Sequence, residues 1–155
     1  MADILRQLLQ EEQELQFKRF NEETAWQVGN QLVERAKNQN ISVTIDITQG
    51  DHQLFHASLP GTSADNDEWI KRKVRLVYRF GHSSFYMGQL LKSKGKRIEE
   101  EYLISESDYA PHGGCFPVIV KDTGMVGTIT VSGLPQEDDH KLVVQSIREF
   151  LAEEK

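Results

Sequence analysis

The sequence contains very little cysteine, no long apolar stretch and no excess of basic residues. Its single cysteine, Cys115, excludes an internal disulfide bond and any zinc or iron–sulfur site built from several cysteines. No apolar run approaches the roughly 18 residues that span a bilayer, and the first residues lack the basic and apolar regions of a secretory signal. A formal net charge of −6, from 18 basic and 24 acidic residues, makes the chain a poor general binder of nucleic acid. We therefore expect a cytoplasmic protein with neither nucleic acid nor a membrane as partner.

The length and composition fit a single domain. Of the 155 residues, 38% are hydrophobic and 27% are charged, as in a folded globular protein rather than a disordered one. A domain of this size buries about 68–70% of its extended-chain surface, which suffices for a core without disulfides or metals. No linker, repeat or low-complexity tract divides the sequence, so we expect one domain over 1–155 that includes the helices predicted within 3–38.

The clearest secondary-structure signal is a strand over 41–48, where apolar and polar residues alternate. This period of two predicts one buried face and one polar face. Turns at 49–51 and 122–124 predict two hairpins, the first pairing 41–48 with 53–58 and the second pairing 116–121 with 125–132. Helical periodicity is present over 3–18, 21–38, 65–80, about 84–95 and 135–151, while 98–104 is ambiguous. The order predicts an α+β fold, with an antiparallel sheet covered by helices.

The densest group of chemically useful residues is the segment from His112 to Phe116. Gly113 and Gly114 allow a positive φ or a close backbone approach, and their amides could form an anion-binding nest. His112 and Cys115 are three residues apart, a spacing that could bring an imidazole and a thiolate together. The alternative interpretation is a tight turn that leads into a buried strand carrying a small buried thiol.

The helix predicted over 65–80 carries five of the 18 basic residues, Lys71, Arg72, Lys73, Arg75 and Arg79. Such a stripe could bind a carboxylate, a phosphate or an acidic partner. It could equally be a solvated face that pairs with glutamates such as those at 99–101.

The same helix has two apolar faces, which one sheet face cannot fully cover. This pattern predicts a homo-oligomer, at least a dimer, with this helix in the interface. The interface residues expected from the pattern are Trp69, Ile70, Val74, Val77 and Phe80.

No catalytic motif supports an enzyme class. His140 lies on the apolar stripe of the last helix, where a half-buried, hydrogen-bonded core histidine is a simpler interpretation than a ligand. Ser83 and Ser84, after Gly81 and His82, are most simply helix caps. The sequence contains no nucleophile-elbow, phosphate-loop, dinucleotide-binding or zinc-protease motif.

Several segments together resemble one protein family. Four segments resemble uncharacterised protein family 0303 (UPF0303): the run from Asn66 to Lys73, Arg79-Phe80 with Ser83-Ser84-Phe85, the run from Gly113 to Pro117 and the run from Thr130 to His140. This family is a branch of the haem-binding and haem-degrading HbpS-like (GlcG-like) superfamily. The matching positions are Asn66, Trp69, Arg72, Phe80, Gly113, Gly114, Phe116, Pro117, Gly133, Asp139 and His140.

The resemblance implies a profilin-like α-β-α arrangement around a five-stranded antiparallel sheet, and assembly into dimers or larger oligomers. It also implies haem or another tetrapyrrole as a candidate ligand, because some members of the superfamily bind haem. The absence of a secretion signal weighs against the extracellular haem-sensing role of some relatives.

We expect a ligand pocket where the 112–116 loop meets the start of the last helix, since Gly133 to Pro135 allow only a short excursion. The expected ligand is a small anion, with haem as one candidate and His112 or His140 as a possible axial ligand. The residues expected to bind it are His112, Gly113, Gly114, Cys115, Phe116, His140, Arg72 and Arg75. Two alternatives stay open: a scaffold that binds a protein partner without a small-molecule site, and an enzyme that uses His112, Cys115 or His140.

Overall fold

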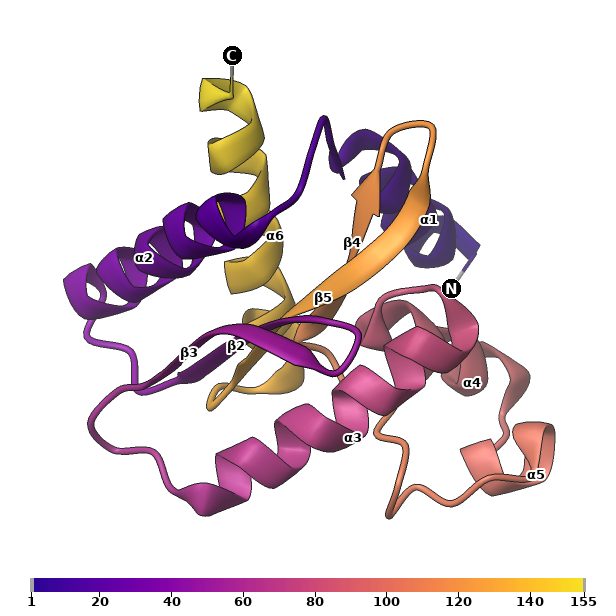
Figure 1. Ribbon diagram of the computed structural model, residues 1–155. Helices are drawn as coiled ribbons and strands as arrows, with labels where there is room; N and C mark the ends of the chain where they lie inside the picture. The colour runs from indigo at the N-terminus through magenta and orange to yellow at the C-terminus, as the bar shows by residue number, and fades with distance from the viewer. Residues whose placement is uncertain (1, 155) are drawn as a thin grey trace.

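The computed structural model describes residues 2–154, which form five strands and six helices (Figure 1). The strands are β1 (Gln16–Phe17), β2 (Thr44–Gln49), β3 (His52–Ser58), β4 (Cys115–Val120) and β5 (Gly124–Ser132). The helices are α1 (Ala2–Glu14), α2 (Glu22–Asn38), α3 (Ala64–Phe80), α4 (Ser84–Lys94), α5 (Ile98–Tyr102) and α6 (Gln136–Glu153).

All five strands form one sheet in the order β1-β4-β5-β2-β3. The two predicted hairpins are confirmed, because β2 pairs with β3 and β4 pairs with β5, both antiparallel. β5 also pairs antiparallel with β2, which joins the hairpins. The predicted α+β class with a five-stranded sheet flanked by helices is therefore confirmed.

The sheet is mixed rather than purely antiparallel, because β1 runs parallel to β4 at the edge. The sequence predicted one helix over 3–18, but α1 ends at Glu14 and Gln16–Phe17 is extended. The side chain of Phe17 is fully buried, and its ring contacts those of Phe20 and Phe150. Burial of this aromatic ring against the core accounts for the break in the helix, since it outweighs local helical propensity.

The apolar core lies between one face of the sheet and helices α2 and α6 (Figure 1). Alternate residues of the central strands point into it, including Ile45 and Ile47 of β2 and Ile129 and Val131 of β5. Asn21 caps α2 by accepting a hydrogen bond from the Thr24 amide at 2.9 Å.

The opposite face of the sheet is polar and is nevertheless buried. The sequence predicted one buried face and one polar face for 41–48, but α3 lies across the polar face (Figure 1). The buried polar side chains of this layer are Thr44, Asp46, Thr128, Thr130 and Ser132. Buried polar groups need hydrogen-bond partners, so the layer under α3 depends on specific contacts more than the apolar core does.

Two of the five interface residues predicted on α3 are buried inside the chain. Ile70 and Val77 are buried within a single copy of the chain. Trp69, Val74 and Phe80 are partly buried, and Phe80 packs on the second apolar cluster formed by α3, α4 and α5. The second apolar face of α3 is therefore covered largely by the chain itself, because α4 and α5 fold back beside it.

No helix within residues 2–154 is long and apolar enough to cross a membrane.

Candidate functional site

A pocket of about 320 Å³ lies where the start of α3, the end of β5 and the start of α6 meet. Its wall includes groups from all three elements: Asp65, Asn66, Trp69, Lys73, His112, Ser132, Gly133, Leu134, Gln136 and Asp139. This is the place where the sequence predicted a pocket, because the 112–116 loop and the start of α6 do meet. The amide of Gly113 donates a hydrogen bond of 3.0 Å to Oε1 of Gln136.

A buried ion pair forms one side of the pocket. Nζ of Lys73 lies 3.3 Å from Oδ2 of Asp139, and both side chains are at most 4% exposed. Lys73 also donates to the carbonyl oxygen of Val131 at 3.2 Å, and Asp139 accepts a hydrogen bond of 2.9 Å from the amide of Leu134. The pair therefore joins α3 to α6 across the end of β5.

Burial shifts both groups of this pair toward their neutral forms. Loss of hydration raises the pKa of Asp139 to about 6, although the Lys73 ammonium opposes that shift. The same loss of hydration lowers the pKa of Lys73 below its usual value, and Asp139 opposes it. Transfer of a proton from the Lys73 ammonium to the Asp139 carboxylate therefore costs less free energy in the pocket than it would in water.

The local sequence explains how these groups reach the pocket. Lys73 falls on the buried stripe of α3, three residues after Ile70 and three before Leu76. Ser63 and Asn66 form a capping box that fixes the first turn of α3. Asn66 also donates a hydrogen bond of 3.3 Å to the Ser132 hydroxyl, which holds this turn against β5.

Two helices begin at the pocket. Asn66 lies in the first turn of α3, and Gln136 is the first residue of α6. The N-terminal end of a helix carries a partial positive charge from its unsatisfied amides, so both ends favour an anion. Together with the Lys73 ammonium, they oppose the negative charges of Asp65 and Asp139.

The two candidate histidines lie in different places. His112 lines the pocket, with its ring against Trp69 and Nε2 only 2.6 Å from Oε1 of Glu106. His140 is buried outside the pocket wall, where Nε2 lies 3.0 Å from Oε1 of Glu11 and the ring packs on Phe85. The expectation that both imidazoles serve one pocket is therefore wrong, since Asp139 and His140 are consecutive on a helix and point in different directions.

The two candidate arginines bind the backbone of the segment that precedes the pocket loop. Arg72 stacks over Trp69 at 4.5 Å and donates to the carbonyl oxygen of Glu106, and Arg75 donates to that of Asp108. Neither residue lines the pocket. The cation at the pocket wall is Lys73, not the predicted Arg72 or Arg75.

The glycines of the 112–116 loop are explained by close packing. A Cβ on Gly113 would collide with the carbonyl oxygen of Gln136, and one on Gly114 would collide with that of Val131 and lie 2.7 Å from Nζ of Lys73. Gly114 also has a φ of +136°, which side chains rarely adopt. Cys115 and Phe116 are buried within β4 and lie outside the pocket wall. These four residues shape the loop beside the pocket.

The thiol of Cys115 should be inert in the folded protein. It is fully buried, and loss of hydration raises its pKa to about 12, so the reactive thiolate is scarcely populated at neutral pH. We expect a thiol reagent such as dithionitrobenzoate to label the native protein only as fast as it unfolds, and the urea-unfolded protein at once. Rapid stoichiometric labelling of the native protein would contradict this expectation.

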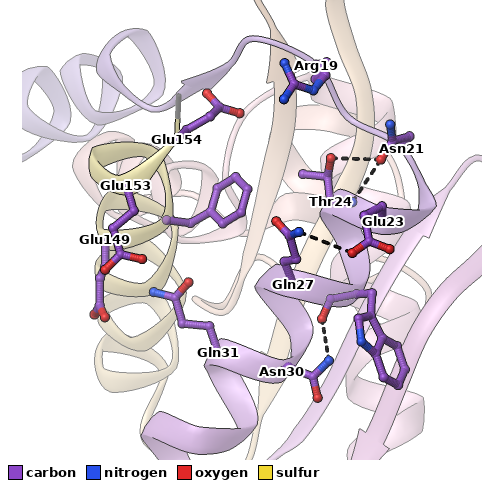
Figure 2. Close-up of a pocket in the computed structure, with 12 residues that line it drawn as sticks. Arg19, Asn21, Glu23, Thr24, Gln27, Asn30, Gln31, Glu149, Glu153 and Glu154 are labelled. Atoms are coloured by element: carbon purple, nitrogen blue, oxygen red, sulfur yellow. Dashed lines mark hydrogen bonds between the residues drawn. The ribbon is translucent and has the colours of Figure 1, made fainter.

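A larger pocket of about 910 Å³ lies between α2 and α6, on the other side of the sheet (Figure 2). Figure 2 shows the amide side chain of Gln31 from α2 turned toward Glu149 of α6, whereas Gln27 donates a hydrogen bond to Glu23 of its own helix. This pocket is an open groove between helix surfaces, and no buried charged group lines it. We therefore place the candidate site at the smaller pocket, which contains the buried ion pair.

No cluster of three or more histidine, cysteine, aspartate or glutamate side chains suited to a metal ion occurs among residues 2–154.

Three pocket residues were not singled out as ligand-binding residues by sequence reasoning. Lys73 was one of a basic stripe with two open interpretations, Trp69 was assigned to an interface, and Asp139 was a position of the family resemblance at the start of the last helix. A usable signal existed for Lys73, because a lysine at the i+3 position of a buried stripe needs a partner inside the protein. For Asp139 and Ser132 the sequence carried no such signal, because their neighbours in the pocket are distant along the chain.

Comparison with known proteins is consistent with this fold. A family model described as "Haem degrading protein HbpS-like" matches residues 20–148. A UPF0303 protein of Streptomyces coelicolor is 45% identical over 152 residues, covering 98% of this chain and 96% of that protein. Among solved structures, the Ybr137w protein has 34% identity and a TM-score of 0.90, covering 96% of this chain and 88% of its own.

A more distant structure, described as a PduOC:Heme complex, shares the fold with a TM-score of 0.66 at 16% identity, over 80% of this chain and 89% of its own. The family predicted from the motifs is thus confirmed by a match that covers most of the sequence. The chain belongs to the HbpS-like family, and within it to the UPF0303 proteins.

Proposed function

We propose that this protein binds a small organic anion in the pocket between α3 and α6. The observation that carries the proposal is the buried Lys73 ammonium at the pocket wall, beside the first turns of two helices. Lys73 has three N–H donors, of which two bond to Val131 and Asp139 within residues 2–154. The third has no partner among those residues, and Asn66, Ser132 and Gln136 add neutral hydrogen-bonding groups to the pocket wall.

The description of the matching family and that of the PduOC complex both name haem, but the residues of this pocket do not fit haem as a ligand. Haem iron needs an axial side chain such as histidine, cysteine, methionine or tyrosine. Nε2 of His112 is engaged with Glu106, and His140 and Cys115 lie outside the pocket wall. A volume of about 320 Å³ is also at the small end of the roughly 300–1,000 Å³ typical of ligand sites. A smaller anion suits the pocket better.

The test is a thermal-shift measurement with oxalate, malate, citrate and inorganic phosphate, and haem in parallel. We expect at least one carboxylate to raise the melting temperature, since a ligand at 100 times its Kd stabilises a protein by about 2.7 kcal/mol. Gln136→Glu should abolish the shift, because it adds a negative charge to the pocket wall. The matched control is Gln145→Glu, the same change at an exposed position of α6 that does not line the pocket.

If no anion shifts the melting temperature of the wild-type protein, the binding proposal is wrong. The alternative, a scaffold that binds a protein partner, is then better supported. A Soret shift with haem that persists in Gln136→Glu would place haem elsewhere on the protein. The enzyme alternative loses one of its candidates, because the Cys115 thiol is buried and protonated. Self-association remains a prediction, now without Ile70 and Val77 as contact residues.

A further inference from the structure

We propose that Lys73 captures the carbonyl group of its bound anion as an imine, so that the ligand is an α-keto acid or an aldehyde acid. This inference rests on the proposed function and names the class of ligand that the pocket takes. It starts from the position of the amine. The side chain of Lys73 is almost fully buried, yet Lys73 belongs to the wall of a pocket formed by α3, β5 and α6.

A lysine is a nucleophile only when its amine is unprotonated, and an exposed lysine is almost fully protonated at neutral pH. Burial of Lys73 lowers its pKa, so a larger share of this amine is neutral than in an exposed lysine, because hydration of the ammonium is lost. The four other basic residues of α3, Lys71, Arg72, Arg75 and Arg79, do not share this environment. Lys71, for example, is 60% exposed and pairs with Glu68 on the helix surface. Of the two lysines of α3, Lys73 is therefore the one whose amine is buried beside a carboxyl group, as a reactive lysine requires.

Asp139 is placed to move the proton that the reaction requires. Its Oδ2 lies 3.3 Å from Nζ of Lys73, while its Oδ1 is held by the amide of Leu134. Burial raises the pKa of this carboxyl to about 6, close to the pH at which a general acid and base is most effective. The carboxyl group can therefore accept a proton from the ammonium and return it to a leaving hydroxyl.

The step balances without any oxidant, reductant or metal. The neutral amine of Lys73 attacks the carbonyl carbon, and a C–N bond forms as the C=O π bond breaks. One N–H proton moves to the carbonyl oxygen, which gives the carbinolamine. Its hydroxyl then leaves as water with the proton that Asp139 took from the ammonium, and the nitrogen lone pair closes the C=N bond of a protonated imine. No electrons enter or leave, and one water molecule is released for each ligand bound.

The remaining wall suits the other half of such a ligand. An α-keto acid carries its carboxylate next to the carbonyl, so a single small site must hold an anion beside the amine. The first turns of α3 and α6 supply that environment at Asn66 and Gln136. The ring centroid of Trp69 lies 6.0 Å from Nζ of Lys73, so an aromatic surface borders the amine.

The test is reductive trapping with pyruvate and with glyoxylate in the presence of sodium cyanoborohydride. We expect the intact mass to rise by the mass of the acid less one oxygen atom, and peptide sequencing to place the adduct on Lys73 before any other lysine. Oxalate, which binds as an anion but cannot form an imine, should protect Lys73. Lys73→Arg keeps the charge and should lose the adduct, whereas Lys71→Arg should retain it.

The outcomes separate this inference from the proposed function. If carboxylates shift the melting temperature but no adduct forms on Lys73, the imine is wrong and anion binding stands. If neither occurs, both are wrong. An adduct spread over surface lysines, unprotected by oxalate and unchanged in Lys73→Arg, overturns the inference. Because the adduct is mapped in the wild-type protein, the result does not depend on whether Lys73→Arg folds.

Discussion

Replacing Asp139 by alanine should lower the free energy of unfolding by about 3–5 kcal/mol, the usual cost of removing one partner of a buried ion pair. The variant leaves Lys73 with 4% of its side chain exposed and without its carboxylate. It also removes the acceptor of the Leu134 amide at the start of α6. Urea unfolding followed by circular dichroism measures the loss, provided that the slope with denaturant matches the wild-type slope.

Two further variants identify the cause. Asp138→Ala changes the adjacent, exposed carboxylate in the same helical turn, so it should cost less than about 1 kcal/mol. The double variant Lys73→Met with Asp139→Leu removes both charges and should recover most of the lost stability. An Asp139→Ala variant no less stable than Asp138→Ala would show that the pair contributes nothing to the fold.

Replacing Gly114 by alanine should cost roughly 2–6 kcal/mol, the sum of about 1–3 for backbone strain and 1–3 for overpacking. Its φ of +136° disfavours any side chain, and the new Cβ would meet the carbonyl oxygen of Val131 and Nζ of Lys73. The wall of the pocket would have to move, so anion binding should fall together with stability. The melting temperature with and without the bound carboxylate measures both effects.

The matched control is Gly50→Ala in the β2–β3 turn. Gly50 also has a positive φ, +64°, but a Cβ there would meet nothing within 4 Å. We expect a cost of only about 1–2 kcal/mol, from the left-handed backbone alone. Equal costs at the two positions would mean that Gly114 is required for its φ and not for the close approach of Lys73.

The sequence by itself determined four of the five strands, most of the helices and the family. The alternation over 41–48 and the turns at 49–51 and 122–124 are local patterns. β3, β4 and β5 lie within one residue of the predicted bounds, whereas β2 begins at Thr44, three residues later than predicted. Such patterns act within a few residues, so a single sequence carries them. The break after α1 was missed, because burial of Phe17 against Phe20 and Phe150 is a tertiary contact.

Only the tertiary structure decided what the site contains. The sequence indicated the 112–116 loop and the start of the last helix, and a pocket does lie there. It could not show that the polar face of β2 and β5 is covered by α3, nor that Lys73 meets Asp139 across 66 positions of sequence. It also could not show that His140 turns away toward Glu11. The physical reason is that charge and polarity are visible along a sequence, whereas burial, which changes the pKa and the reactivity of the same side chain, depends on what packs against it.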